Sequence, residues 1–255
     1  MNDVLVLSYH AVSDGWPSPL AVRIAALERQ VARLLDRGYR PATVSEAVHA
    51  PAADRVMAIT FDDAYRSVAA NALPLLHRLG VPATVFAVTD YADSGAPLTW
   101  PGLAGWADGP YARELEPMSW DELAEAADAG WEVGSHTRSH PRLSSIDASE
   151  LAEELAGSRR RCEQVLGRPC RALAYPYGDH DDRVVEAVRA AGYTTACTVP
   201  DALRPEYPLR WPRIGVYRDD TPLTFATKVS PLVRRGRGTA AGPPAARALR
   251  RVRGR

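Results

Sequence analysis

The sequence predicts an α/β fold in which parallel strands form a closed or nearly closed barrel. Short apolar runs typical of buried strands alternate with amphipathic helical patterns along most of the chain. Repeated strand–helix units of this kind indicate a parallel sheet. Seven or so units fit a distorted, TIM-like (β/α) barrel with about seven strands, and 255 residues suffice for one large domain of this type.

The expected elements follow in order. We expect strands at 4–9, 55–61, 83–88, 131–135, 171–176 and 193–199. Helical spacing of apolar residues predicts helices at 24–35, 69–79, 119–129, 147–166 and 182–191. Glycines stand where the first three helices should end, at 38, 80 and 130. Ser119 and Glu122 have the spacing of a capping box.

Two segments fall outside this alternation. Residues 90–117 are rich in Pro, Gly and aromatic residues and predict an irregular insertion or lid. We expect a catalytic barrel over residues 1–220 and an Arg-rich, largely disordered tail over 221–255. Nine of the 31 basic residues and none of the acids lie beyond Asp220, so the body carries 22 bases against 31 acids.

The composition limits which binding partners and which cellular location we expect for this protein. The acidic body disfavours a nucleic-acid-binding role, although the basic tail could contact an anionic membrane weakly. No secretory signal and no run near 20 apolar residues is visible. We therefore expect a cytoplasmic protein, with the tail allowing peripheral contact at the inner membrane face. The three cysteines lack metal-site spacing and are expected to be reduced and packed.

Polar motifs follow several of the predicted strands. His136 and His140 lie four residues apart, and the pair Asp62–Asp63 ends the strand MAITF. Loops after parallel barrel strands open on one face, so these side chains can converge. Two imidazoles and one carboxylate form a binding set for zinc or a neighbouring transition metal. The alternatives are a solvated histidine loop and aspartates that cap a helix beginning at Ala64.

The motifs ITFDDAY, SHTRSH and AYPYG, in this order, resemble those of the polysaccharide deacetylase family, also called carbohydrate esterase family four. The resemblance extends over roughly residues 4–218. It implies a distorted (β/α) barrel that removes acetyl groups from amino sugars or other glycans. By position it implies that Asp63, His136 and His140 bind the metal and that Asp62 is the general base. The backbone N–H of Tyr177 would help to stabilise the oxyanion.

Three positions depart from the usual family pattern, and two of these departures point to one branch. Ala64 replaces a common Gly, which we expect to be a minor change, and Ala174 replaces an Arg that supports the catalytic aspartate. The late histidine that acts as general acid is missing. The poly-N-acetylglucosamine deacetylase branch is similar in both of the last two respects and carries an N-terminal Tyr-His, as in LSYHAV. His10 is thus the expected acid, with His180 as the alternative.

The missing arginine needs a substitute, and Arg213 is our candidate. Its alternative interpretation is an ordinary structural arginine. Several aromatic residues could stack on sugar rings or simply pack, namely Trp100, Trp106, Tyr111 and Trp211, and Trp211 could line an acetyl pocket.

The expected function is metal-dependent N-deacetylation of amino sugars, a hydrolysis of non-peptide C–N bonds. Zn²⁺ is the expected metal, with Co²⁺, Ni²⁺ and Fe²⁺ as alternatives, and an acetylated amino sugar is the expected partner. The alternatives are an O-acetyl esterase, an amidase acting on a small or lipid-linked substrate, and an inactive sugar-binding homologue.

Overall fold

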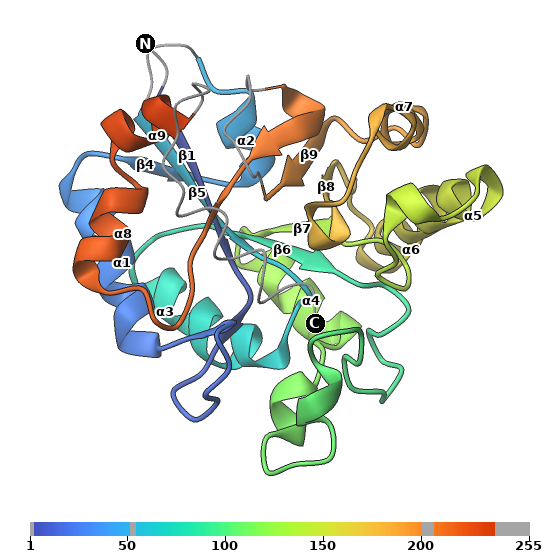
Figure 1. The fold of residues 1–255 in the computed structure, drawn as a ribbon, viewed down its shortest axis with the longest axis horizontal. Helices are drawn as coiled ribbons and strands as arrows, with labels where there is room; N and C mark the ends of the chain where they lie inside the picture. The colour runs from blue at the N-terminus through green and yellow to red at the C-terminus, as the bar shows by residue number, and fades with distance from the viewer. Residues whose placement is uncertain (1–2, 52–54, 200–206, 238–255) are drawn as a thin grey trace.

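A computed structural model describes residues 3–51, 55–199 and 207–237. Its centre is a twisted sheet of parallel strands that curls into a barrel, with helices around the outside (Figure 1). The strands along the sheet are β1 (Asp3–Tyr9), β5 (Arg55–Phe61), β6 (Thr84–Ala87), β7 (Glu132–Ser135), β8 (Ala172–Ala174), β9 (Thr195–Thr198), β10 (Trp211–Pro212) and β11 (Ile214–Gly215). The predicted barrel is confirmed, and all six predicted strands are present.

One short segment closes the ring. β10 pairs with β9 through Trp211 and Cys197, while β11 pairs with β1 through Ile214 and Leu7. Only Arg213 separates β10 from β11, so this segment bridges the first and last long strands. The pairing between neighbouring strands is uneven around the barrel. Between β7 and β8 it extends over a single residue pair, Ser135 and Leu173.

Three further short strands were not predicted. The first is β4 (Arg40–Ala42), which pairs with the first half of β5, whereas the predicted strand β6 pairs with the end of β5. β2 (Ala11–Val12) and β3 (Ala21–Val22) form a separate two-stranded sheet. His10 alone separates β2 from the end of β1, and β3 precedes α1.

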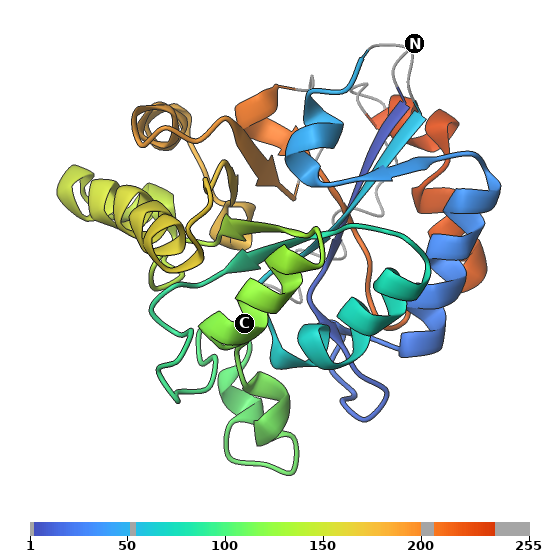
Figure 2. The same ribbon diagram turned by 180° about the vertical axis from the view of Figure 1, so that it is seen from behind.

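The helices surround the barrel on both sides (Figures 1 and 2). They are α1 (Ile24–Asp36), α2 (Val44–Val48), α3 (Leu73–Arg78), α4 (Trp120–Asp128), α5 (Ala148–Ala152), α6 (Ser158–Leu166), α7 (Asp182–Ala190), α8 (Pro222–Lys228) and α9 (Pro231–Arg237). The π-helical turn η1 (Val68–Ala72) leads directly into α3. A second π-helical turn, η5 (Glu153–Gly157), connects α5 to α6. The predicted capping box is confirmed, because Ser119 Oγ accepts from the Glu122 amide at 3.1 Å and the Glu122 carboxylate accepts from the Ser119 amide at 2.9 Å.

Successive side chains of a strand point to opposite faces of the sheet, so the strands contribute to two separate hydrophobic layers. On β1, Leu5 and Leu7 belong to the large core beneath the helices, whereas Val4 and Val6 belong to a second cluster inside the barrel. Members of that inner cluster come from six of the eight strands along the sheet, from β4 and from the short helix α2. The inward-facing series on β5 continues from Ala58 to buried Thr60, and so the interior changes from apolar to polar toward the carboxyl ends.

The predicted lid is folded against the body. Residues 90–117 contain the 3₁₀ turns η2 (Ala104–Trp106) and η3 (Ala112–Leu115). Leu98, Leu103 and Leu115 are buried in the main core. The amide of Leu98 donates to the carbonyl of Leu115 at 2.9 Å, which ties the two ends of the insertion together. The prediction of an irregular segment is confirmed, and the segment is anchored at several points.

The predicted disordered tail needs correction over 222–237. This part forms α8 and α9, and Phe225 and Val229 are buried in the main core. Pro222 and Pro231 begin the two helices, and apolar residues of this segment pack on the body although the tail as a whole is basic. Residues 238–255 lie outside the described part of the chain, so disorder there stays a prediction.

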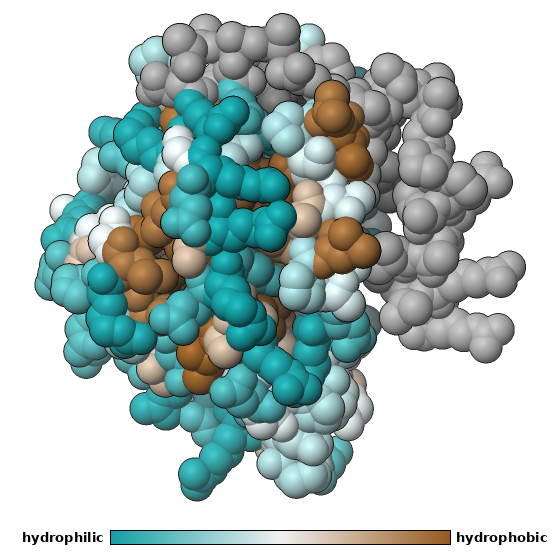
Figure 3. Space-filling model, turned by 90° about the vertical axis from the view of Figure 1, so that its left-hand side faces the viewer, coloured by the Kyte–Doolittle hydropathy of each residue, from teal (hydrophilic) through white to brown (hydrophobic). Residues whose placement is uncertain are grey.

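Leu223 and Leu232, on α8 and α9, are the most exposed large hydrophobic residues of the described chain, at 77% and 80%. Figure 3 shows a face that is largely hydrophilic with separated hydrophobic patches. No helix within the described residues combines the length and apolar character needed to cross a membrane.

Candidate metal and catalytic site

Asp62 and Arg213 form a buried ion pair at the carboxyl end of the barrel interior. Asp62 directly follows β5, and its amide still donates to the Tyr9 carbonyl at 2.9 Å. Arg213, between β10 and β11, donates to both carboxylate oxygens, at 2.6 and 2.8 Å. Ser8 Oγ adds a third hydrogen bond at 3.2 Å. The predicted substitute, Arg213, therefore lies in direct contact with Asp62, while its catalytic role stays a prediction.

The charge of Arg213 decides the ionisation of Asp62. Burial by itself would raise the pKa of this carboxyl group, but the guanidinium charge and its hydrogen bonds hold the pKa far below the usual range. Arg213 is itself 2% exposed and also donates to Thr60 Oγ1 at 2.9 Å. Asp62 is thus a fixed carboxylate, and the helix-capping alternative does not describe it.

Asp63 faces the two predicted histidine ligands. Its Oδ1 atom lies 3.3 Å from Nε2 of His136 and 3.4 Å from Nε2 of His140. One ligand atom from each residue falls within 4.8 Å of the others, and all three residues are buried. These distances bring the predicted carboxylate and imidazoles together at one point.

The donor set fits a divalent cation. The His136 Nδ1 atom lies 2.8 Å from the Ala174 carbonyl, which can only accept, so Nδ1 carries a proton and Nε2 is the nitrogen that faces Asp63. Burial lowers the pKa of His136, but the hydrogen bond with Asp63 and the charges of Asp62 and Asp63 raise it above the ordinary value. Burial lowers the pKa of His140 to about 3, aided by the charge of His136, which keeps this ring neutral and able to ligate. Asp63 Oδ1 is buried and receives no hydrogen bond of ordinary geometry from any described residue. A cation would satisfy all three groups.

Left-handed backbone conformations cluster around the site. Six residues other than glycine in the described chain have positive φ, and five of them belong to the site motifs: Asp63, Ala64, Thr137, His140 and Tyr177. Each such conformation costs an L-residue about 1–2 kcal/mol. Ala64 has a φ of 48°, which explains physically why glycine suits this position. The replacement we expected to be minor therefore lies at a strained position.

Tyr177 lies beside the metal ligands. It is in the 3₁₀ turn η6 (Pro176–Gly178) that follows β8, and its ring centroid is 4.6 Å from that of His140. Arg142 lies over the same ring, at 4.4 Å. The structure thus brings the predicted oxyanion donor to the site, while its catalytic role stays a prediction.

The two candidate acids differ in their surroundings. Burial lowers the pKa of His10, while the nearby charges of Asp63 and Asp62 raise it in part, so His10 lies within electrostatic reach of both carboxylates. His10 Nδ1 is buried without a hydrogen-bond partner among the described residues. His180 instead stacks on Tyr175 and contacts the Gly178 carbonyl through Nδ1 at 3.0 Å. These positions favour His10 over His180.

The aromatic residues divide into packing and site contacts. Trp100, from the 90–117 insertion, stacks on the His140 ring with centroids 4.0 Å apart and planes 17° apart. Trp106 packs edge-on against Trp16 at 5.8 Å and close to Tyr111. Trp211 is 4% exposed within the inner cluster of the barrel, so its predicted place in an acetyl pocket gives way to core packing.

Sequence reasoning missed the residue that supports the histidine loop. Glu154, on η5, accepts hydrogen bonds from the amides of Arg138 and Ser139. It lies in an ordinary helical pattern, and only its burial and contacts in the folded structure distinguish it. No local sequence signal indicates this role.

Comparison with known proteins places these motifs in a family. The model of the polysaccharide deacetylase family matches residues 49–196, more than half of the chain. That range contains both aspartates, both ligand histidines and Tyr177, whereas His10 and Arg213 lie outside it. The matched region therefore carries Asp62, Tyr177 and the three residues that face one another as metal ligands, and the two ends of the chain supply His10 and Arg213.

Several relatives and solved structures are similar to this chain. The poly-β-1,6-N-acetyl-D-glucosamine N-deacetylase of Staphylococcus epidermidis is 27% identical over 172 residues, covering 63% of this chain and 54% of its own length. The Escherichia coli K12 enzyme of the same name is 25% identical over 53% of this chain and 21% of its own. The chain thus spans less than two thirds of these relatives.

Solved structures agree over a longer stretch. A polysaccharide deacetylase from Bacillus cereus superposes with a TM-score of 0.73 at 27% identity, over 89% of this chain and 69% of that one. IcaB from Ammonifex degensii has the same fold, with a TM-score of 0.67 at 24% identity over 94% of this chain and 98% of its own. The predicted resemblance, including the poly-N-acetylglucosamine branch, is confirmed. By its matched motifs and its fold, the chain belongs to the polysaccharide deacetylase family.

Proposed function

We propose that this protein is a metal-dependent deacetylase that hydrolyses the acetamido group of N-acetylated amino sugars. The observation that carries the proposal is the pairing of two buried sites at one strand end. A carboxylate fixed by Arg213 stands next to a carboxylate that faces two imidazoles. Family membership and the names of the matched relatives support an acetylated amino sugar as substrate.

Asp63, His136 and His140 would hold the metal. Zn²⁺ is the proposed ion because one carboxylate and two imidazoles suit it, and Co²⁺, Ni²⁺ and Fe²⁺ accept similar ligands. When bound, such an ion lowers the pKa of water and polarises an acyl oxygen.

Asp62 and His10 divide the proton transfers. Water attacks the acetyl carbon, and Asp62, kept ionised by Arg213, accepts the proton that the water loses. The C–N bond then breaks, and His10 donates a proton to the departing nitrogen. The Tyr177 amide donates to the developing oxyanion, where one preorganised donor typically contributes 10²–10³ in rate. Acetate and a free amine are the products.

Acetate release from defined substrates tests the proposal. We would assay N-acetylglucosamine oligomers with β-1,6 and β-1,4 linkage, a lipid-linked N-acetylglucosamine and an O-acetylated sugar, each with chelator and with restored Zn²⁺ or Co²⁺. We expect metal-dependent acetate release from the amide substrates and none from the Asp63→Asn variant. Faster release from the ester would identify an O-acetyl esterase. Sugar binding without acetate release would identify an inactive homologue.

A further inference from the structure

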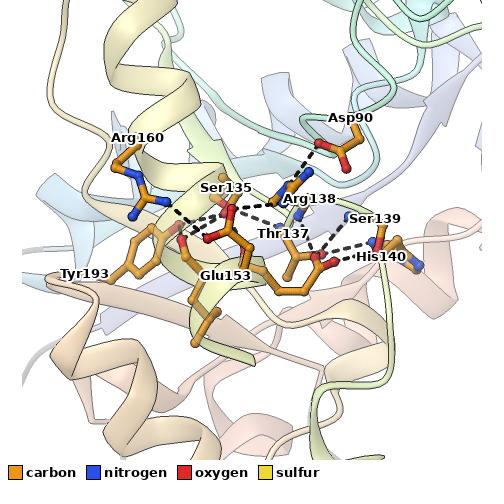
Figure 4. A network of polar contacts seen from close by, with 12 residues as sticks. Asp90, Ser135, Thr137, Arg138, Ser139, His140, Glu153, Arg160 and Tyr193 are labelled. Atoms are coloured by element: carbon orange, nitrogen blue, oxygen red, sulfur yellow. Dashed lines mark hydrogen bonds and ion pairs between the residues drawn. The ribbon is translucent and has the colours of Figure 1, made fainter. Parts of the chain in front are cut away.

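The loop that carries both metal-binding histidines has an unusual pattern of hydrogen bonds. Its four successive amides, from Thr137 to His140, all donate to side-chain oxygens (Figure 4). The Thr137 amide donates to Ser135 Oγ at 3.0 Å, and the His140 amide donates to Thr137 Oγ1 at 3.1 Å. Buried amides need partners, and here no regular ladder provides them. Side chains therefore fix the path of this loop.

The two central amides share one acceptor. The amides of Arg138 and Ser139 donate to Oε2 of Glu154, at 2.8 and 3.0 Å. The hydroxyl of Ser139 donates to the other oxygen, Oε1, at 2.6 Å. Glu154 is only 7% exposed, and hydrogen bonds to a charged acceptor are stronger than neutral ones. Both of its oxygens are thus committed to the loop.

The opposite side of the loop is hydrogen-bonded to the turn that follows β6. The carbonyls of Thr137 and Arg138 accept from the amides of Thr89 and Asp90, at 3.1 and 3.0 Å. Glu154 approaches from η5, and π-helical turns often occur at functional sites. The loop is therefore held between the end of β6 and the η5 turn.

The loop needs this support because its backbone is strained. Thr137 and His140 have φ values of 68° and 67°. Such conformations persist only where the surroundings fix them. His140 Nδ1 has no hydrogen-bond partner among the described residues, so the backbone and the stacked Trp100 ring determine where Nε2 points. Relaxation of the loop would move that nitrogen away from Asp63.

We propose that Glu154 is a positioning residue for the metal site, a carboxylate clamp that holds the loop so that His140 faces Asp63. The inference rests on the metal site of the proposed function. Glu154 binds backbone amides and one serine hydroxyl, and its contribution passes through the position of His140.

The adjacent residue is a matched control. Glu153 belongs to the same turn, but its carboxylate bonds to the side chains of Arg138 and Arg160 at 2.9 and 3.2 Å. These are exposed ion pairs, which contribute little to stability. Glu153→Gln and Glu154→Gln make the same chemical change one residue apart.

The test is zinc affinity, measured on the full chain by competition with a chromophoric chelator. Glu154→Gln should weaken zinc binding about 10- to 100-fold, the range typical of lost outer partners of metal ligands. Glu153→Gln should bind like the wild type. At a fixed zinc concentration, zinc should raise the Tm of Glu154→Gln by less than it raises the Tm of the wild type. If Glu154 had only a structural role, the substitution would lower the Tm of the zinc-free and the zinc-bound protein by the same amount.

Equal zinc affinity in Glu154→Gln and the wild type would overturn the clamp and leave the proposed function intact. Absence of zinc binding by the wild type would overturn both. If Glu154→Gln does not fold, Ser139→Ala removes only the Oε1 contact, and it should weaken zinc binding by a smaller factor. Unchanged affinity in that variant would then count against the clamp.

Discussion

The two halves of the site treat their carboxylates differently. Asp62 receives three hydrogen bonds from the protein, two of them from Arg213. Asp63, the next residue, leaves a buried oxygen that no described residue satisfies with a regular hydrogen bond. The base half, Asp62 with Arg213, pairs its charges within the protein, whereas the metal half, Asp63 with His136 and His140, presents its carboxylate oxygen to two imidazoles. Of these two adjacent residues, Asp62 therefore takes part in an ion pair within the protein, whereas Asp63 is available to bind a ligand.

The strand geometry produces this division. Asp62 continues the inward-facing series of β5, so its side chain enters the barrel where Arg213 closes the ring. Asp63 has a φ of 69°, which turns the chain and directs its carboxylate toward the histidine loop. Ala64 also has a positive φ, so the chain turns at the point where the two neighbouring carboxylates take different partners.

The largest expected effect is on the base half. Arg213→Met leaves Asp62 buried without its cation, and breaking such a pair costs about 3–5 kcal/mol of unfolding free energy. Denaturant unfolding would measure it. Arg189→Met is the control, since its pair with Glu186 on α7 is exposed to solvent and contributes little to stability. A loss below about 1 kcal/mol in Arg213→Met would mean that the ion pair does not support the fold.

The metal half should respond to zinc and much less to mutation alone. Asp63→Asn removes a carboxylate that faces two imidazoles, so we expect the metal-free protein to keep its fold. Zinc at 100 times its Kd should stabilise the wild type by about 2.7 kcal/mol, and this gain should vanish in the variant. Thermal unfolding with and without zinc measures both quantities. An equal zinc-induced gain in both proteins would remove Asp63 from the ligand set.

Acid unfolding tests whether the folded protein holds Asp62 ionised. Because the folded-state pKa of Asp62 lies well below its unfolded value, its stabilisation is fully present above the ordinary aspartate pKa of about 3.9. It is lost as pH falls from there toward the folded pKa. Unfolding free energies at pH 5 and pH 3 should therefore drop more steeply in the wild type than in Asp62→Asn. Parallel decreases would show that Asp62 is not held ionised.

The smallest expected effect concerns Trp100. Its stacking on His140 should contribute about 0.5–1.5 kcal/mol, so Trp100→Leu should weaken zinc binding roughly two- to tenfold. Trp106→Leu is the control, because Trp106 contacts Trp16 and Tyr111 and no metal ligand. Chelator competition gives both affinities. Equal values for the two variants would make Trp100 a packing residue only.

Local signals in the sequence predict the frame of this molecule well. Apolar runs located six of the barrel strands, and the capping box at Ser119 set the start of α4. The site motifs could be predicted because they are contiguous and each follows a strand. Arg213 could be proposed only from an arginine missing elsewhere, since its partner is 151 residues away in the chain.

Other features depend on the folded state alone. The closure of the barrel by β10 and β11 involves strands of two residues, too short to give a periodic pattern. Backbone strain at Ala64 and Thr137 follows from tertiary contacts and not from propensity. Glu154 looks like any helical acid until its burial is known. Long-range packing therefore determines the parts of the site that local reasoning missed.

Paired measurements on Asp62→Asn and Asp63→Asn test the division of labour most directly. Zinc affinity and acetate release from an N-acetylglucosamine oligomer would be measured on each variant and on the wild type. We predict that Asp62→Asn binds zinc but releases no acetate, and that Asp63→Asn does neither. Acetate release by metal-stripped Asp63→Asn, or at the wild-type rate by Asp62→Asn, would contradict the account.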